Sequence, residues 1–503
     1  MKSIVKHWRR IAVTLIPVLL ALLHAVGVVR IGVLQRLDDI IYDARLQATM
    51  PKTLDDRVVI IDIDEKSLAD LGRWPWSRNK LADLVNTLFQ DQEIAILGFD
   101  VVFAEADESS GLARLSQLAR NELKDYPAFS DRLKQLQPDL DFDAAFAAAL
   151  ANRPVVMGYY LSSDKEGRSN GVLPAPVLRP DALQGRQIRA TSWTGYGANI
   201  EQLAKAAPMA GFFNSITDSD GVVRSLPLLA EYRGEYYESI ALSMFRVIAG
   251  MPSVAPGFSN ERFLAKNYQG MDRVLLKQGD KALAIPVDER VATLVPYRGR
   301  GGVNGGSFRY VSATDVVKKK LPPGSLKGKV VLLGTTAPGL LDLRVTPVGE
   351  TYPGVETHAN IISALLDGNM LVRPDYAIGY EVVMVLLSGL LLAFGLPLLS
   401  APRAVLLSVA ALAVLLSMNL WLYLGYGLVL PLASVLAMVV ASFGLNMSYG
   451  YFVESRSKRE LANLFGTYVP PELVDEMLKD PDSYNMQATN RELTVCLLYT
   501  SPS

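Results

Sequence analysis

The chain has 503 residues, enough for two to four structural units. Its 50 Lys and Arg residues almost balance 51 Asp and Glu residues, so it lacks the basic surface typical of nucleic-acid-binding proteins, and we expect no nucleic-acid partner. The single cysteine, Cys496, excludes intrachain disulfides and metal sites built from cysteines, and we expect no metal site. The hydrophobic content of 50% is high for a soluble protein and indicates that part of the chain lies in a lipid bilayer.

The first apolar block, residues 11–29, follows a basic segment at residues 1–10. Its length corresponds to roughly 28 Å of helix, which is close to the thickness of the hydrocarbon core. A secretory signal peptide has a similar pattern, but no clean cleavage site precedes Arg30. We therefore interpret residues 11–29 as an uncleaved transmembrane helix. Both interpretations carry the chain beyond residue 30 across the membrane.

Three further apolar blocks lie at about 377–399, 404–424 and 427–449. The connections between them are so short that neighbouring helices must run antiparallel. We therefore expect three transmembrane helices within residues 377–449.

The positions of basic residues predict the orientation of the four helices. Residues 1–10, Arg403 and the group at 456–459 all fall on one side of a four-helix arrangement. The positive-inside rule places this side in the cytoplasm. Residues 30–375 are then extracytoplasmic, and the chain from residue 450 onward is cytoplasmic.

Residues 30–375 alternate between apolar strand-like runs and helical patterns. Continuous apolar runs at 57–64, 93–103 and 328–335 predict strands buried on both faces of one sheet. Apolar residues at helical spacing predict a helix at 77–89 with Ser77 as its N-cap. Because this helix connects the first two strands, we expect those strands to form a parallel pair. A second helix is expected at 354–368.

Other parts of this region are less regular. Residues 104–150 are expected to be helical, and residues 161–206 to form surface loop. Residues 211–229 read as strand, turn and strand, and residues 230–310 as irregular antiparallel structure. The predicted fold class is an α/β extracytoplasmic domain with a mixed sheet, plus four transmembrane α-helices and a short cytoplasmic helical linker.

Polar residues follow the three predicted strands. Ligands bind beyond the carboxyl ends of strands in open parallel sheets. This rule brings together a candidate sensor pocket of Asp62, Asp64, Asp100, Thr335 and Thr336. A purely structural interpretation is favoured by the pattern, since aspartates after strands often cap the next helix.

Two other polar motifs are interpreted structurally. The DSDG motif at 218–221 lacks the longer spacing of a calcium-binding loop, so we interpret it as a plain turn. His358, a lone histidine in the predicted helix at 354–368, is expected on the helix surface.

Four motifs resemble the CHASE type-2 (CHASE2) sensor domain, a bacterial extracytoplasmic module attached to several kinds of cytoplasmic output. They are VVIIDIDEKSLADLGRWPWSR, ILGFDVVFAEAD, GFFNSITDSDGVVRSLPLL and LKGKVVLLGTTAPGLLDLRVTPVGETYPGVETHANIISALLDG. The resemblance covers roughly residues 30–375, and the three-helix block that follows is similar to the family's usual arrangement. It implies reception of a signal from an unknown extracytoplasmic ligand.

The segment at 454–481, with FGTYVPPELVDEML and then RELTV at 491–495, resembles the entry to class III adenylate/guanylate cyclase domains. The resemblance implies a cytoplasmic signalling linker at 450–490 and a homodimer. An apolar stripe there is suited to pairing two copies: Leu461, Leu464, Phe465 and Tyr468.

The cyclase resemblance implies a metal-binding aspartate near Tyr499, where the chain instead reads CLLYTSPS. We interpret residues 491–503 as the first strand of a truncated cyclase domain with an aberrant tail. The chain then contains no catalytic residue and no cofactor of its own, and it should have no cyclase activity. An intact domain would use two Mg²⁺ or Mn²⁺ ions.

The sequence therefore predicts a multi-pass receptor of the bacterial inner membrane whose intact form makes cyclic AMP from ATP. ATP and GTP both remain open as substrates. One alternative is the sensor of a two-component or Ser/Thr kinase system, although no histidine follows His358 to serve as a phosphoacceptor. The other alternative is a non-enzymatic envelope binding protein.

Overall fold

A computed structural model describes residues 7–164, 166–258, 270–337 and 343–454. Its contacts divide the chain into two compact units. One contains residues 25–383 and 414–434, and the other is formed by 1–24, 384–413 and 435–503. Each unit is described by itself.

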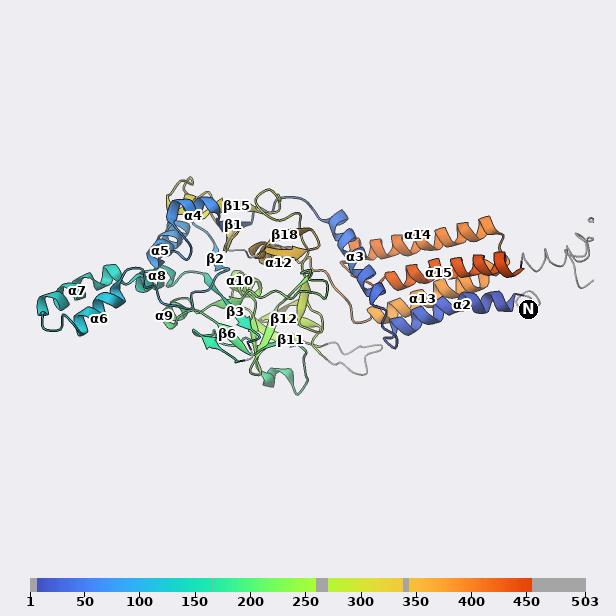
Figure 1. The fold of residues 1–503 in the computed structure, drawn as a ribbon, viewed down its shortest axis with the longest axis horizontal. Helices are drawn as coiled ribbons and strands as arrows, with labels where there is room; N and C mark the ends of the chain where they lie inside the picture. The colour runs from blue at the N-terminus through green and yellow to red at the C-terminus, as the bar shows by residue number, and fades with distance from the viewer. Residues whose placement is uncertain (1–6, 165, 259–269, 338–342, 455–503) are drawn as a thin grey trace, which may run out of the picture. The chain divides into compact units, whose positions relative to one another are not determined.

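The larger unit is built on an eight-stranded mixed sheet, part of which is labelled in Figure 1. The strand order is β15 (Arg309–Ser312), β1 (Val58–Ile63), β16 (Val330–Thr335), β2 (Ile96–Phe99), β3 (Val155–Ser162), β6 (Gly195–Gly197) and β4 (Ser169–Asn170), with β7 (Ala210–Phe212) paired to β3. The three predicted strands do share one sheet, and the mixed α/β class is confirmed.

The expected pairing of the first two predicted strands is wrong. Strands β1 and β2 run parallel to β16, which lies between them. Five of the six residues of β16 are buried, and the central position gives this strand a partner on each edge. The crossover through α5 (Arg78–Asn86) therefore skips one strand position.

Apolar side chains from the two faces of the sheet form separate cores. On one face, Ile60 and Leu332 belong to a cluster with residues of α10 (Ile240–Ile248) and α12 (Gly354–Asp367). On the other face, Ile61 and Leu333 pack with residues of α5 and α8 (Phe142–Leu150). A Cβ on Gly334 would lie only 2.5 Å from the Cβ of Val355, so glycine lets α12 approach β16 closely.

Smaller sheets complete this unit. They are β9 (Leu229–Tyr232) with β10 (Glu235–Glu238) and β5 (Thr191–Trp193); β11 (Ser253–Gly257) with β12 (Arg273–Gln278) and β13 (Lys281–Pro286); β8 (Ser225–Pro227) with β14 (Ala292–Leu294); and β17 (Leu343–Thr346) with β18 (Gly349–Pro353). Antiparallel pairing within residues 230–310 is confirmed. The predicted strand, turn and strand at 211–229 are present, and an antiparallel bridge between Ile216 and Ser225 flanks the turn. The main partners of β7 and β8 are β3 and β14.

Helices occupy most of residues 104–150, as predicted. They are α6 (Leu112–Arg120), α7 (Pro127–Leu140) and α8, and Figure 1 shows α6 and α7 as neighbouring helices. The predicted surface loop at 161–206 was too simple an interpretation. This segment also contains the short strands β4, β5 and β6 and the helix α9 (Glu201–Ala206). The strands were not predicted because such short strands give almost no periodic signal.

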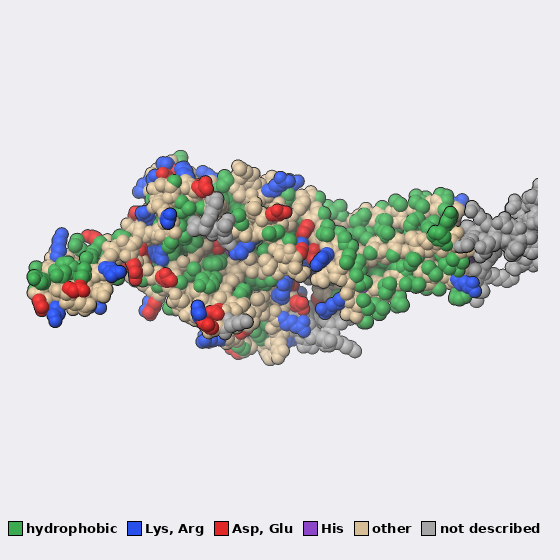
Figure 2. Space-filling model, viewed as in Figure 1, with side chains coloured by type: hydrophobic (Ala, Val, Ile, Leu, Met, Phe, Trp, Pro, Cys, Tyr) green, Lys and Arg blue, Asp and Glu red, His purple; other side chains and the backbone are tan. Residues whose placement is uncertain are grey.

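Four helices of the described part are long and apolar enough to cross a membrane. They are α2 (Trp8–Ala25), α13 (Ala377–Gly395), α14 (Ala401–Tyr426) and α15 (Ala433–Tyr449). Hydrophobic side chains cover most of the visible surface of these helices in Figure 2. In the smaller unit, Asn446 of α15 accepts a 2.8 Å hydrogen bond from Arg10 and donates one of 3.0 Å to Thr14 of α2.

A helix that the sequence analysis did not identify directly follows the first of these helices. Helix α3 (Gly32–Thr49) carries five charged side chains and is therefore unlike the four long apolar helices. Tyr42, Arg45 and Leu46 are buried at helical spacing, and this spacing was the signal that could have revealed the helix.

Candidate functional site

The candidate sensor pocket begins with Asp62, near the carboxyl end of β1. Its side chain is only 2% exposed, and Thr336 donates a 2.6 Å hydrogen bond to its Oδ2 atom. Within the described residues its Oδ1 atom has no hydrogen-bond partner. The pKa of Asp62 is raised to about 6, chiefly by burial and also by the nearby Asp64, against the opposing hydrogen bond from Thr336.

Asp64 has a different role from Asp62. It is the N-cap of α4 (Glu65–Leu71), where its Oδ1 atom accepts 2.8 Å hydrogen bonds from the Ser67 amide and the Ser312 hydroxyl. This geometry matches the structural interpretation that aspartates after strands cap the next helix. Its carboxylate therefore fixes the start of α4 and links β15 to it.

Asp100 follows β2 and lies beside the end of β16. Its amide donates a 2.8 Å hydrogen bond to the carbonyl of Leu333, and its Oδ1 atom lies 3.9 Å from Nε2 of His358. The expectation that His358 lies on a helix surface is wrong, since its side chain is 4% exposed. Burial lowers the pKa of His358 to about 4, so its imidazole is neutral at pH 7. This neutral ring faces a carboxylate without forming a full ion pair.

The structure places all five predicted pocket residues at one edge of the sheet, because β1, β16 and β2 are parallel neighbours in that order. Thr335 is the last residue of β16 and lies opposite Ile63 in the strand pairing. Two of these five side chains, Asp62 and Thr336, are joined by a hydrogen bond. A ligand-binding role for these residues stays a prediction.

Sequence reasoning missed a second buried carboxylate, Glu356 in the first turn of α12. It is fully buried and accepts hydrogen bonds from the Gly302 amide (2.7 Å) and from the hydroxyls of Tyr310 (2.6 Å) and Tyr352 (3.1 Å). Burial raises its pKa, while these donors oppose the rise. The signal in the sequence was a glutamate and an asparagine, Glu356 and Asn360, one turn apart on a helix with many apolar residues.

Polar contacts continue from Glu356 along α12. Asn360 donates a 2.7 Å hydrogen bond to Tyr352 and accepts one of 2.9 Å from the Arg298 amide. One turn later, Ser363 donates a 2.6 Å hydrogen bond to Asp55. Burial alone would raise the pKa of Asp55, but hydrogen bonds from Arg57 and Ser363 hold it well below its usual value. Helix α12 thus carries a buried polar row from the region of the candidate pocket to the start of β1.

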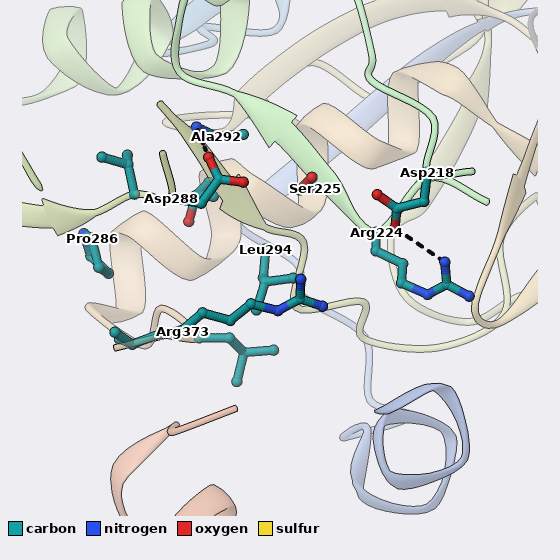
Figure 3. A pocket seen from close by; sticks show the side chains of 12 residues that line it. Asp218, Arg224, Ser225, Pro286, Asp288, Ala292, Leu294 and Arg373 are labelled. Carbon is teal, nitrogen blue, oxygen red and sulfur yellow. Dashed lines mark hydrogen bonds and ion pairs between the residues drawn. The ribbon is translucent and has the colours of Figure 1, made fainter. Parts of the chain in front are cut away.

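The DSDG turn at 218–221 does more than reverse the chain. The Gly221 amide donates a 2.9 Å hydrogen bond to the Asp218 carbonyl, which confirms the turn. Both aspartates of the turn also bind the guanidinium of Arg224, which is only 2% exposed. Figure 3 shows the side chains of Asp218 and Arg224 pointing toward one another, with Arg373 extending into the same pocket.

The described residues contain no group of three or more His, Cys, Asp or Glu side chains that could hold a metal ion. The site contains buried acidic groups, two of which, Asp62 and Glu356, have raised pKa values. Such groups are candidates for binding a proton or a hydrogen-bond donor.

A mixed α/β domain on a chain with four span-length helices defines a membrane protein with a substantial domain outside the bilayer. The family model described as CHASE2 domain matches residues 16–396, which is more than half of the chain. The protein belongs to the CHASE2 family, whose domain is a sensor found in signalling proteins. No curated protein and no solved structure matches the chain.

Proposed function

We propose that this protein is a receptor of the bacterial inner membrane whose extracytoplasmic CHASE2 domain controls a cytoplasmic adenylate cyclase. The observation that carries the proposal is the order of segments along the chain. A CHASE2 match over 16–396 is followed by two further span-length helices and then by FGTYVPPELVDEML and RELTV. This order links a sensor to a catalytic output across the membrane.

The carboxyl edge of the central sheet is the place where we propose that the signal is received. The side chains of Asp62 and Asp100 are buried there, and Asp100 lies beside the neutral His358, so a change in charge or hydrogen bonding would act on well-packed strands. The start of α12 contributes both His358 and Glu356, and this helix then runs along the sheet to Asp367. The ligand itself is proposed only as a small extracytoplasmic signal.

The output half of the proposal rests on sequence. The linker at 450–490 extends beyond the described residues, which also leave out the stripe of Leu461, Leu464, Phe465 and Tyr468 and the strand at 491–495. We propose that the stripe pairs two copies of the chain and that the active cyclase is a homodimer. The intact catalytic domain would bind two Mg²⁺ or Mn²⁺ ions, which activate the ribose hydroxyl and stabilise the leaving pyrophosphate.

The activity test is to continue the chain after Val495 with a complete class III cyclase domain. In cells lacking their own cyclase, we expect this fusion to make cyclic AMP from ATP with Mg²⁺ or Mn²⁺. Paired substitutions Leu461→Glu and Leu464→Glu should lower this activity at least tenfold, because two charges would lie in the dimer contact. Asn463→Glu, which falls on the opposite side of the same helical pattern, is the matched control.

An inactive fusion would contradict the cyclase proposal. An active fusion that tolerates charges at Leu461 and Leu464 would contradict the dimer role of the stripe and leave the cyclase proposal standing.

Topology is tested separately from activity. Reporter fusions at about residues 200 and 460 should fall on opposite sides of the membrane, since the positive-inside rule places the basic residues near 456–459 in the cytoplasm. Alkaline phosphatase, active only outside, and green fluorescent protein, active only inside, serve as complementary reporters. The same side at both positions would overturn the proposed orientation.

A further inference from the structure

Helix α3 contacts the sensor domain through a charged interaction, in addition to the hydrogen bond that Gln47 donates to the Pro347 carbonyl. Asp43 of α3 accepts two hydrogen bonds of 2.8 Å from Nε and Nη2 of Arg224, in a paired geometry. The same guanidinium also binds Asp218 at 3.1 Å and Asp220 at 2.8 Å. Arg224 is thus shared between the DSDG turn of the sensor domain and a helix that directly follows α2.

Other side chains of α3 contact the last two turns of α14 and the start of α15. Asp38 accepts hydrogen bonds of 2.7 Å and 2.8 Å from the amides of Leu432 and Ala433, where α15 begins. Arg45 donates a 2.5 Å hydrogen bond to Asn419 of α14, and its guanidinium lies 4.3 Å from the ring centroid of Tyr423. A carboxylate at a helix N-terminus is a favourable cap, and a guanidinium over an aromatic ring is a favourable stack.

The burial of Arg224 makes its contact with α3 sensitive to small movements. Its side chain is 2% exposed, and the three carboxylates that surround it are 21% to 34% exposed. A buried guanidinium is stable only while its charge and its donors are matched. A shift of the DSDG turn would therefore have to move Asp43 with it or break two charged hydrogen bonds.

We propose that α3 is the element that transmits movement from the sensor domain to the span ends, and that Arg224 is the positioning residue that attaches it to the sensor. Arg224, held by the DSDG turn, binds Asp43 on one side of α3. Asp38 and Arg45 of α3 contact α15 and α14. A displacement of the turn is passed through α3 to the start of α15. This coupling holds for any cytoplasmic output and does not depend on the cyclase proposal.

Hydrogen exchange of the full chain in detergent micelles or nanodiscs tests this coupling directly. Asp43→Asn removes the charge that joins α3 to Arg224 but leaves Arg224 paired with Asp218 and Asp220. We expect the backbone amides of α3 to exchange at least tenfold faster in this variant. The amides of Leu432 and Ala433 should also exchange faster, because loosening α3 weakens their hydrogen bonds to Asp38. The amides of β1 should be unchanged.

Asp39→Asn is the matched control. Asp39 lies one turn before Asp43 on the same helix, and its electrostatic interaction with Arg224 includes no hydrogen bond to it. We expect exchange in α3 to stay at the wild-type rate. Equal acceleration in both variants would overturn the proposal, because helix charge rather than the Arg224 contact would then hold α3.

Two other results would overturn the coupling. Unchanged exchange in α3 of Asp43→Asn would show that Arg224 does not hold the helix. Faster exchange in α3 with unchanged amides at Leu432 and Ala433 would show that α3 does not act on α15. Arg224→Gln is a second variant, expected to accelerate α3 further; if it also loses protection in β1, it has unfolded the domain and Asp43→Asn alone decides.

Discussion

Replacement of Glu356 by alanine is expected to lower the free energy of unfolding of the α/β domain by about 3 kcal/mol. The substitution leaves three donors without their acceptor, namely the half-buried Gly302 amide and Tyr310 hydroxyl and the buried Tyr352 hydroxyl. It also leaves a cavity beneath the first turn of α12, where the exposed fraction of Glu356 is zero. A buried donor that loses its partner is destabilising by more than the average hydrogen bond stabilises.

Glu356→Gln is the matched control for this prediction. The glutamine side chain keeps one oxygen acceptor and nearly the same volume. It replaces a buried carboxyl group whose pKa is already raised. We expect it to stay within about 1 kcal/mol of the wild type. Thermal unfolding followed by tryptophan fluorescence measures both variants. A loss as large in Glu356→Gln as in Glu356→Ala would show that the charge, rather than the hydrogen bonds, carries the stability.

Replacement of Asp62 by asparagine should stabilise the protein, and the gain should depend on pH. The folded-state pKa of Asp62 is raised from 3.8 to about 6, so the folded protein holds this proton more tightly than the unfolded chain does. The stability that comes from this group is complete below pH 4 and is lost as the pH rises through 6. The pKa difference corresponds to roughly 3 kcal/mol. Asp62→Asn should therefore be close to wild type at pH 4 and more stable by up to about 3 kcal/mol at pH 8.

Comparing the stability of Asp62→Asn with that of the wild type at each pH separates the contribution of Asp62 from that of His358. The pKa of His358 is lowered to about 4, so this histidine makes stability rise with pH over part of the same range. Its contribution cancels when the two proteins are compared at each pH. Thr336→Val gives the complementary test, because it removes the donor to the Asp62 anion and should destabilise the protein more at pH 8 than at pH 4. A difference between Asp62→Asn and wild type that is constant with pH would refute the raised pKa.

The carboxyl-edge residues illustrate what a sequence can reveal about a site. The positions of Asp62, Asp100, Thr335 and Thr336 after apolar strands were enough to place them at one edge, because parallel strands end together. Their different environments were not predictable. Asp62 is buried, and one of its oxygens has no hydrogen-bond partner among the described residues, whereas Asp64 caps α4. This distinction depends on which elements cover each strand end.

For His358 and the DSDG turn, the local sequence pattern did not reveal which distant elements surround the side chains. His358 was expected on a surface because it is a lone histidine in a predicted helix. In fact α12 is buried along nearly its whole length, by the sheet on one side and by other segments of the domain around it. The turn was predicted correctly, but the local pattern did not reveal that Asp218 and Asp220 share Arg224 with Asp43 of α3, which is distant in sequence.

The sequence by itself determined the features that follow from local pattern. Four apolar blocks predicted four span-length helices, continuous apolar runs predicted β1, β2 and β16, and the motifs indicated the CHASE2 family. Only the tertiary structure decided that β16 lies between β1 and β2, that the buried Glu356 accepts three hydrogen bonds, and that Arg224 binds Asp43 across 181 positions of sequence. The physical reason is range: hydrophobic periodicity reports the environment of a residue along its own element, whereas strand order and the pairing of buried charges depend on which distant elements pack together.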